Sequence, residues 1–137
     1  TGHTLLLLDA TGAYHREVSR QMDSKGLHFT TPMMQLQDPK QTKVLIVTLA
    51  EQTPVLEAAN LQADLRRAGI EPWAWIINNS LAMAQPQSAL LQQRAASEWT
   101  HIETVAQNHA QRWAIVPLQT EEPVGIQRLQ KLTRHSF

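Results

Sequence analysis

Three short apolar runs, each followed by a segment of helical character, most constrain how this chain of 137 residues can fold. The runs span residues 43–49, 72–79 and 113–118. Continuous β-branched and aromatic residues are typical of strands that are buried on both faces of a parallel sheet. Because strands and helices alternate along the chain, we predict an α/β fold with a parallel sheet, flanking helices and right-handed crossovers.

Local signals predict where the helices begin and end. A helix over residues 53–67 is expected because Thr53 can cap it, Pro54 suits its first position and Gly69 can end it. The other predicted segments are a polar-faced helix over residues 13–22, a mostly irregular stretch over residues 27–41, a long helix from residue 86 to about residue 112, and a last helix over roughly residues 125–134.

Composition excludes several classes of protein. The length fits one domain with a core of its own. Twelve basic and twelve acidic side chains cancel, so no electrostatic footprint for nucleic acid is present and no nucleic-acid partner is expected. The absence of cysteine excludes disulfides and thiolate metal sites within this chain. No apolar stretch approaches the roughly 20 residues of a membrane span and no signal peptide is visible, so we expect a cytoplasmic domain.

In α/β sheets, ligands bind at the carboxyl ends of the strands. The residues that follow the three runs are therefore candidates: residues 48–51, 78–79 and 117–122. Each group has a simpler interpretation. Asn-Asn-Ser after a strand is usually a turn, because these side chains bond their own backbone. Glu51 suits a loop carboxylate or a helix cap, and Pro117 with Leu118 can simply end a strand.

Known catalytic motifs are missing from the sequence. The chain has no G-x-x-x-x-G-K-[ST] phosphate loop, no G-x-G-x-x-G turn, no H-E-x-x-H pair and no G-x-S-x-G elbow. His101 and His109 are eight residues apart on a predicted helix, and we interpret them as solvated surface histidines rather than metal ligands. Trp73 and Trp75 occupy alternate positions of one predicted strand, which favours packing over a stacking platform.

Five segments in the right order resemble the arsenical pump-driving ATPase family, which includes the tail-anchored-protein targeting ATPases. T-G-H-T-L-L-L-L-D-A at residues 1–10 resembles the latter part of the family's D-T-A-P-T-G-H-T signature. Residues 48–57 resemble its V-T-x-x-E-x-x-x-x-E segment, and residues 76–78 its adenine-side I-x-N motif. Residues 117–125 resemble its P-L-x-x-x-E-P-x-G adenine loop, while M-M-Q-L-Q-D-P at residues 33–39 is most similar to the bacterial pump subunit.

This resemblance implies that residues 1–137 are the C-terminal portion of the second nucleotide-binding half of such an ATPase. The sheet would be part of a P-loop NTPase-type sheet that lacks its P-loop strand. The parent would hydrolyse ATP with Mg²⁺, be stimulated by arsenite or antimonite, and energise a membrane metalloid efflux pump. Its partners would be the remainder of the ATPase chain and the membrane-embedded pump subunit, which would hold it at the inner membrane from the cytoplasmic side.

The resemblance also implies roles for individual residues. Thr1, Gly2, His3 and Thr4 match a switch turn that follows an aspartate near Mg²⁺ and the attacking water, and that moves with γ-phosphate occupancy. His3 matches the histidine that helps bind trivalent arsenic or antimony, with cysteine partners from outside this chain.

The adenine-side matches are Asn78, Pro117, Leu118, Glu122 and Gly125. The Asn78 amide offers the donor and acceptor that the adenine edge requires, and Pro117 with Leu118 would form an apolar wall. Glu122 and Gly125 would shape the loop. Asn79 is expected to lie on the other side of the strand and to tolerate alanine.

Two alternatives stay open. One is a fragment of a tail-anchored membrane-protein targeting ATPase, although residues 81–112 lack a C-x-x-C pair and a Met-rich helix. The other is a non-enzymatic α/β binding module. If the chain is a fragment of an arsenical pump-driving ATPase, we expect that it has no ATPase activity alone. We also expect that it binds Mg-ATP no tighter than roughly millimolar, because it has no phosphate loop. An exposed strand edge would also lead it to self-associate.

Overall fold

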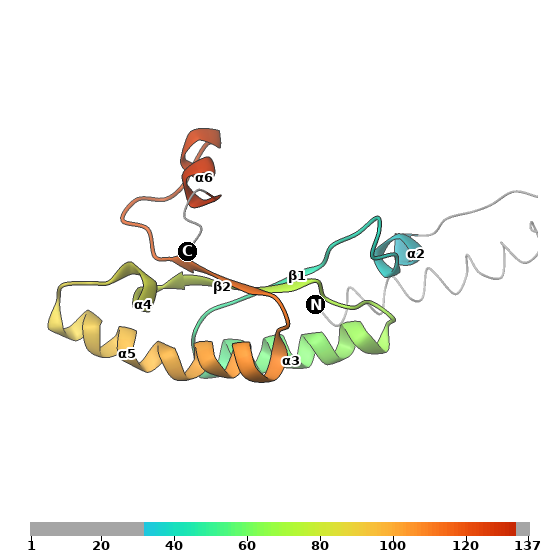
Figure 1. Cartoon of the computed structure of the whole chain (residues 1–137), viewed down its shortest axis with the longest axis horizontal. Helices are drawn as coiled ribbons and strands as arrows, with labels where there is room; N and C mark the ends of the chain where they lie inside the picture. The colour runs from blue at the N-terminus through green and yellow to red at the C-terminus, as the bar shows by residue number, and fades with distance from the viewer. Residues whose placement is uncertain (1–31, 134–137) are drawn as a thin grey trace, which may run out of the picture. The chain divides into compact units, whose positions relative to one another are not determined.

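The computed structural model describes residues 32–133. The expected helix over residues 13–22 lies outside the described residues. The elements in chain order are α2 (Pro32–Gln37), β1 (Leu45–Thr48), α3 (Gln52–Arg67), β2 (Ala74–Ser80), α4 (Leu81–Ala84), α5 (Ala89–Thr104), the π-helical turn η1 (Val105–His109), β3 (Trp113–Pro117) and α6 (Ile126–Thr133) (Figure 1). The chain divides into two compact units. Of the described residues, the first unit comprises residues 32–46 and 56–74, and the second comprises residues 47–55 and 75–133.

The predicted α/β class is confirmed. The described strands form one sheet in the order β1-β2-β3, with β2 parallel to β3. Trp75 lies opposite Trp113, and Ile77 lies opposite Ile115. The register then shifts, so that Ser80 comes to lie opposite Pro117. Parallel pairing places the carboxyl ends of β2 and β3 at the same edge of the sheet.

In the first unit, the predicted stop of α3 at Gly69 is confirmed. Gly69 has a left-handed backbone (φ 74°) and its N–H donates to the Arg66 carbonyl at 3.0 Å. The Ile70 N–H donates to the Leu65 carbonyl at 2.9 Å, and both side chains are buried. This pair of bonds is the Schellman motif, which satisfies carbonyls at a helix end. The Gln37 amide donates to the Ala68 carbonyl at 2.7 Å and joins α2 to this turn.

Two expectations about chain segments before β2 are wrong. Thr53 is not the N-cap, because α3 begins at Gln52 and the Glu51 carbonyl accepts the Val55 N–H at 3.1 Å. Residues 27–41 are not mostly irregular where described, since α2 begins at Pro32, which suits a first helical turn. After α2, hydrogen bonds from the Lys40 N–H and then from the Gln41 amide lower the pKa of Asp38.

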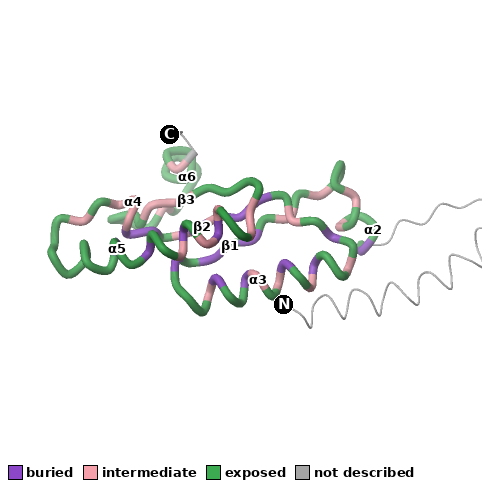
Figure 2. The backbone as a smooth tube through the Cα atoms, turned by 60° about the horizontal axis from the view of Figure 1, so that its bottom comes forward, coloured by how far each residue is buried: buried purple, intermediate pink, exposed green. Residues whose placement is uncertain are grey.

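The expectation that the first strand is buried on both faces is also wrong. Along β1 the burial alternates, so Leu45 is 47% exposed and Val47 is 61% exposed, while Ile46 and Thr48 are buried. In β2, by contrast, most positions are buried or half-buried (Figure 2). β1 lies at the end of the described strand order, and its sequence alone could not show what covers each face.

The long helix expected from residue 86 to about residue 112 is present with shorter bounds, since it begins at Ala89 and ends at His109. α4 is a separate short helix, and α5 continues into η1, where the Ala110 N–H donates to the Val105 carbonyl at 2.9 Å. A bond over five residues widens the last turn. The His109 ring stacks on the Trp75 indole, with centroids 5.4 Å apart and an interplanar angle of 16°. The interpretation of His109 as a solvated surface histidine is therefore wrong.

The core of the second unit is built around β2 and the inner face of α5 and η1. Trp75, Ile77, Ile102 and Val105 are each at most 2% exposed. Within residues 32–133, none of the helices combines the length and the apolar character that a membrane crossing requires.

We predict that the 137-residue chain self-associates, because Val47 presents an apolar side chain on a strand at the end of the described sheet. Val47→Lys should weaken self-association by roughly tenfold in Kd, since a charge on an edge strand opposes pairing. Gln107→Lys adds the same charge at an exposed position of η1 and should leave association unchanged. Sedimentation equilibrium measures both, and a clean monomer for the unsubstituted chain at high concentration contradicts the prediction.

Candidate functional site

The candidate site lies at the carboxyl end of β2, in the second unit. Asn78 is half-buried, and within the described part of the chain its side-chain amide makes no hydrogen bond. Asn79 is exposed and has a left-handed backbone (φ 55°). The shift in register between Ile77 and Ser80 removes these two residues from the regular ladder with β3. Asn tolerates the left-handed region better than most residues, which fits a local Asn-Asn sequence.

Pro117 and Leu118 lie at the end of β3 beside this segment. Pro117 is opposite Ser80, and the Leu118 N–H donates to the Ser80 carbonyl at 2.9 Å. The Leu118 side chain is 44% exposed, and the Gln119 amide donates to the Pro117 carbonyl at 2.8 Å. The structure therefore brings Asn78 and the pair Pro117–Leu118 to the same edge of the sheet.

Glu122 and Gly125 lie further along the same loop. The Glu122 side chain is exposed, and its backbone carbonyl accepts the Val124 N–H at 2.8 Å and the Arg128 guanidinium at 3.2 Å. Gly125 has a left-handed backbone (φ 86°), and its carbonyl accepts the Leu129 N–H at 3.1 Å as α6 begins. Both residues make these contacts through their backbone carbonyls, which fix the path of the loop between β3 and α6.

A residue that sequence reasoning missed, Glu98, holds the end of β2 in place. Its carboxylate comes from α5 and is only 8% exposed. It accepts hydrogen bonds from the Ser80 hydroxyl at 2.8 Å, the Leu81 N–H at 3.1 Å and the Ala82 N–H at 3.0 Å. Buried carboxylates are stable only when paired or hydrogen-bonded, and here three donors meet one carboxylate. One glutamate in a helix rich in Ala and Gln carries no local sequence signal.

Residues 48–51, the other predicted group, form a separate arrangement. The Thr48 hydroxyl donates to the Leu49 carbonyl at 3.2 Å, and Thr48 is buried. Glu51 forms an ion pair with Arg94 of α5 at 3.1 Å, with both side chains at least half exposed. An exposed pair of this kind contributes little to stability. The interpretation of Glu51 as a loop carboxylate at a helix start fits this geometry.

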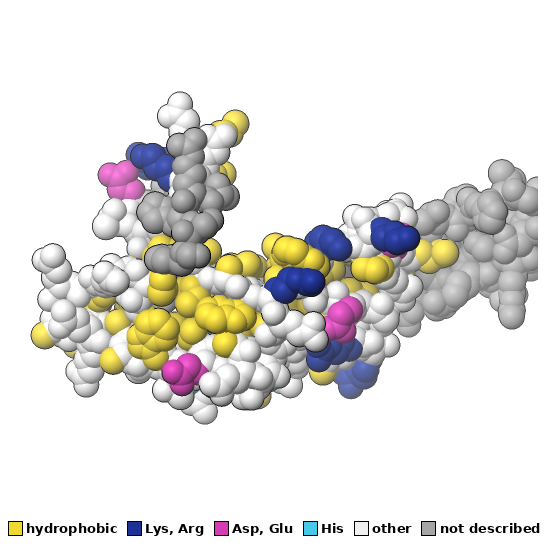
Figure 3. Space-filling model, viewed as in Figure 1, with side chains coloured by type: hydrophobic (Ala, Val, Ile, Leu, Met, Phe, Trp, Pro, Cys, Tyr) yellow, Lys and Arg dark blue, Asp and Glu magenta, His cyan; other side chains and the backbone are white. Residues whose placement is uncertain are grey.

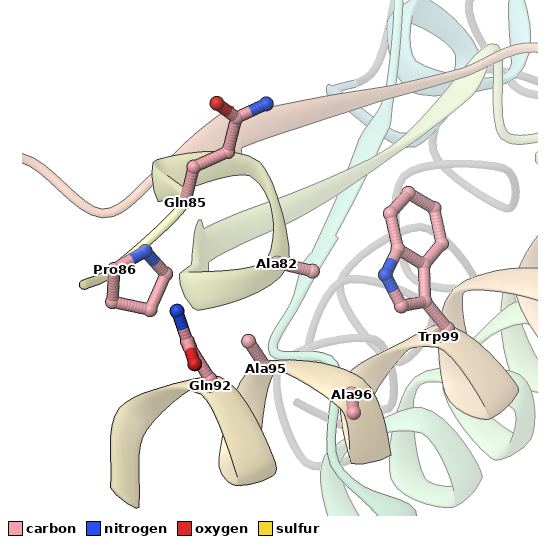
Figure 4. A pocket seen from close by; sticks show the side chains of 7 residues that line it. All are labelled: Ala82, Gln85, Pro86, Gln92, Ala95, Ala96 and Trp99. Atoms are coloured by element: carbon pink, nitrogen blue, oxygen red, sulfur yellow. The ribbon is translucent and has the colours of Figure 1, made fainter. Parts of the chain in front are cut away.

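A shallow open groove of about 350 Å³ lies between α4 and α5 (Figure 4). Its walls are Ala82, Gln85 and Pro86 on one side, and Gln92, Ala95, Ala96 and Trp99 of α5 on the other. None of the predicted site residues lines it. Apolar side chains also gather on the visible face of the second unit (Figure 3). Among the exposed apolar side chains of this unit, Trp99 and Trp113 are each more than two-fifths exposed.

The predicted switch turn and metalloid histidine, Thr1, Gly2, His3 and Thr4, lie outside the described residues. Across residues 32–133, no three His, Cys, Asp or Glu side chains lie together in a way that could hold a metal ion. The described part of the site is an edge at which the Asn78 amide, the Pro117 ring and the Leu118 side chain lie.

Comparison with known proteins gives consistent matches along the chain. The family model of the anion-transporting ATPases matches residues 1–135. An arsenical pump-driving ATPase of Acidiphilium multivorum and one of Escherichia coli are each 68% identical over 132 residues, which cover 96% of this chain and 22% of the relative. A putative arsenical pump-driving ATPase of Halobacterium salinarum is 27% identical over 138 residues. The chain spans about a fifth of the length of these curated relatives.

The left-handed backbone of Asn79 predicts that alanine lowers the stability of the chain here, while the expected tolerance of alanine in nucleotide binding stays a prediction. Asn79→Ala should lower the free energy of unfolding by about 1 kcal/mol, because alanine is disfavoured at positive φ. Asn79→Gly should leave the free energy of unfolding nearly unchanged, since glycine adopts this region freely. Urea denaturation followed by tryptophan fluorescence measures both, and equal values for the two variants would contradict the left-handed conformation.

Proposed function

The chain belongs to the anion-transporting ATPase family, and from this membership we propose that it supplies the adenine side of a nucleotide site in an arsenical pump-driving ATPase. The proposal assigns residues 1–137 to the C-terminal portion of the second nucleotide-binding half. The observation that carries it is the Asn78 amide at the sheet edge, to which no described residue is hydrogen-bonded, with Pro117 and Leu118 beside it.

The chemistry of this edge fits an adenine ring. An Asn amide presents one acceptor and two donors, and the N6/N7 edge of adenine presents one donor and one acceptor. Because the Asn78 amide is not engaged by the described residues, it is available to a base. The half-exposed Leu118 and the ring of Pro117 offer an apolar surface against which a planar base can pack. Glu122 and Gly125 would set the path of the loop around it.

We propose that other parts of the ATPase bind the phosphates and Mg²⁺ of the substrate. The switch turn at Thr1, Gly2, His3 and Thr4 would act together with those parts. In phosphoryl transfer, Mg²⁺ neutralises charge that develops on the phosphate oxygens. Residues 32–133 would contribute by binding and orienting the base. The chain alone is accordingly proposed to be inactive, since its sequence has no phosphate loop.

We further propose that arsenite or antimonite stimulates the parent enzyme, with His3 as one ligand. The names of the relatives, arsenical pump-driving ATPases, support an arsenical as the activator and a pump as the partner. We propose that this pump subunit is embedded in the inner membrane and binds the ATPase from the cytoplasmic side. The same relatives favour the pump branch over a tail-anchored-protein targeting ATPase or a non-enzymatic module.

In the full-length ATPase, Asn78→Ala should raise the KM for ATP roughly tenfold, equivalent to ~1.4 kcal/mol of lost binding, with a much smaller change in kcat. Discrimination against GTP should weaken in parallel, because the amide that pairs with the adenine N6 group no longer rejects the guanine O6. Steady-state hydrolysis of both nucleotides measures these effects.

Asn79→Gly is the matched control for that experiment, because it removes the neighbouring amide without straining the backbone. It should leave the KM and the ATP/GTP ratio unchanged. If Asn78→Ala changes neither quantity, Asn78 is only a turn residue and the base site is assigned wrongly.

His3→Ala should reduce metalloid stimulation of ATP hydrolysis several-fold while basal hydrolysis stays largely intact. A ligand on a switch turn can bias the switch only through different affinities for its two states, so its loss uncouples metalloid from nucleotide. ATPase rates with and without antimonite measure the effect. His28→Ala serves as the control for histidine removal elsewhere in the chain. Stimulation that is unchanged in His3→Ala would show that His3 only packs or hydrogen-bonds within the turn.

A further inference from the structure

The end of β2 is held by a hydrogen-bond network that centres on Ser80. The Ser80 hydroxyl donates to the Glu98 carboxylate at 2.8 Å and accepts the Met83 N–H at 3.3 Å. The Ser80 carbonyl accepts the Leu118 N–H at 2.9 Å. Ser80 is 1% exposed, so these bonds form away from water. One residue therefore joins α5, the start of α4 and the end of β3.

We propose that Glu98 is a positioning residue for the base site, acting through Ser80 on Asn78 and Leu118. This inference rests on the proposed adenine site. Asn78 lies two residues before Ser80, in the stretch where the ladder with β3 is interrupted. Regular pairing with β3 does not hold this stretch, so on that side the position of Asn78 depends on its fixed neighbours. Leu118 is bonded to Ser80 directly, so one anchor sets both sides of the site.

The three donors around Glu98 require a carboxylate. Its Oε2 atom accepts from Ser80 and Ala82, and its Oε1 atom accepts from Leu81. A glutamine at this position has one oxygen and one NH₂ group. In either orientation of the amide, the NH₂ group faces a backbone N–H, and at least one of the three bonds is lost. An unpaired donor in a buried place is costly, so the turn is expected to shift.

In the full-length ATPase, Glu98→Gln should raise the KM for ATP roughly tenfold while kcat changes less than about threefold. Discrimination between ATP and GTP should weaken as it does in Asn78→Ala. Glu103→Gln makes the same chemical change at an exposed position of α5 and should leave the KM unchanged. Ser80→Ala breaks the network from its other end. It should raise the KM similarly, and the double substitution should add little to either single one.

Inorganic tripolyphosphate separates positioning of the base from general damage. It has no base, so its inhibition constant against ATP hydrolysis should be the same in Glu98→Gln and in the unsubstituted enzyme. Two results would overturn the positioning role and leave Glu98 as a structural residue. The first is that Glu98→Gln weakens the binding of ATP and of tripolyphosphate equally, and the second is a lower melting temperature with an unchanged KM. If Glu98→Gln does not fold, Ser80→Ala measured in the same way decides between these outcomes.

The result for Asn78→Ala distinguishes failure of this inference from failure of the base site. A raised KM in Asn78→Ala with an unchanged KM in both Glu98→Gln and Ser80→Ala overturns only the positioning role. An unchanged KM in Asn78→Ala overturns the base site, and the positioning role with it.

Discussion

The bond from the Leu118 N–H to the Ser80 carbonyl resumes the pairing of β2 and β3 after the ladder has been interrupted. Without it, the two strand ends would diverge, because no regular pairing joins residues 78 and 79 to β3. Parallel strands present their carboxyl ends at one edge, which is where α/β sheets bind ligands. The local geometry of that edge is set by this bond and by the Glu98 carboxylate that fixes the Ser80 side chain.

The core beneath this edge contains a buried polar group whose missing hydrogen bond lowers stability. The Trp75 indole N–H is buried, and no acceptor reaches it among the described residues. A buried donor without a partner costs about 1–3 kcal/mol. Against this, Trp75 buries the largest side chain of the core and stacks on His109. The π-helical turn η1 supports the stack, since the wider last turn ends the helix at His109 beside Trp75.

Features that depend on neighbouring residues in sequence could be predicted, and features that depend on distant ones could not. Gly69 ends α3 as expected, because a left-handed glycine cap is a local signal. That Asn78 and Pro117 share an edge followed from strand and helix alternation alone. The half-exposed β1 was not foreseen, since burial depends on what packs against each face. Glu98 was missed because its partner Ser80 is 18 residues away, and no spacing rule joins them.

The candidate site departs from regular strand geometry in several ways, and all of these departures occur at the end of β2. Asn79 lies in the left-handed region, the strand register shifts, and a carboxylate is buried within 3.1 Å of three donors. A left-handed non-glycine residue and a broken strand register are each unfavourable, and such segments persist only where surrounding contacts determine them. A regular end to β2 would continue the strand's backbone pairing with β3 through Asn78 and Asn79. The irregular end releases the backbone of Asn78 and Asn79 from that pairing, and the Glu98 network supplies bonds that stabilise this conformation.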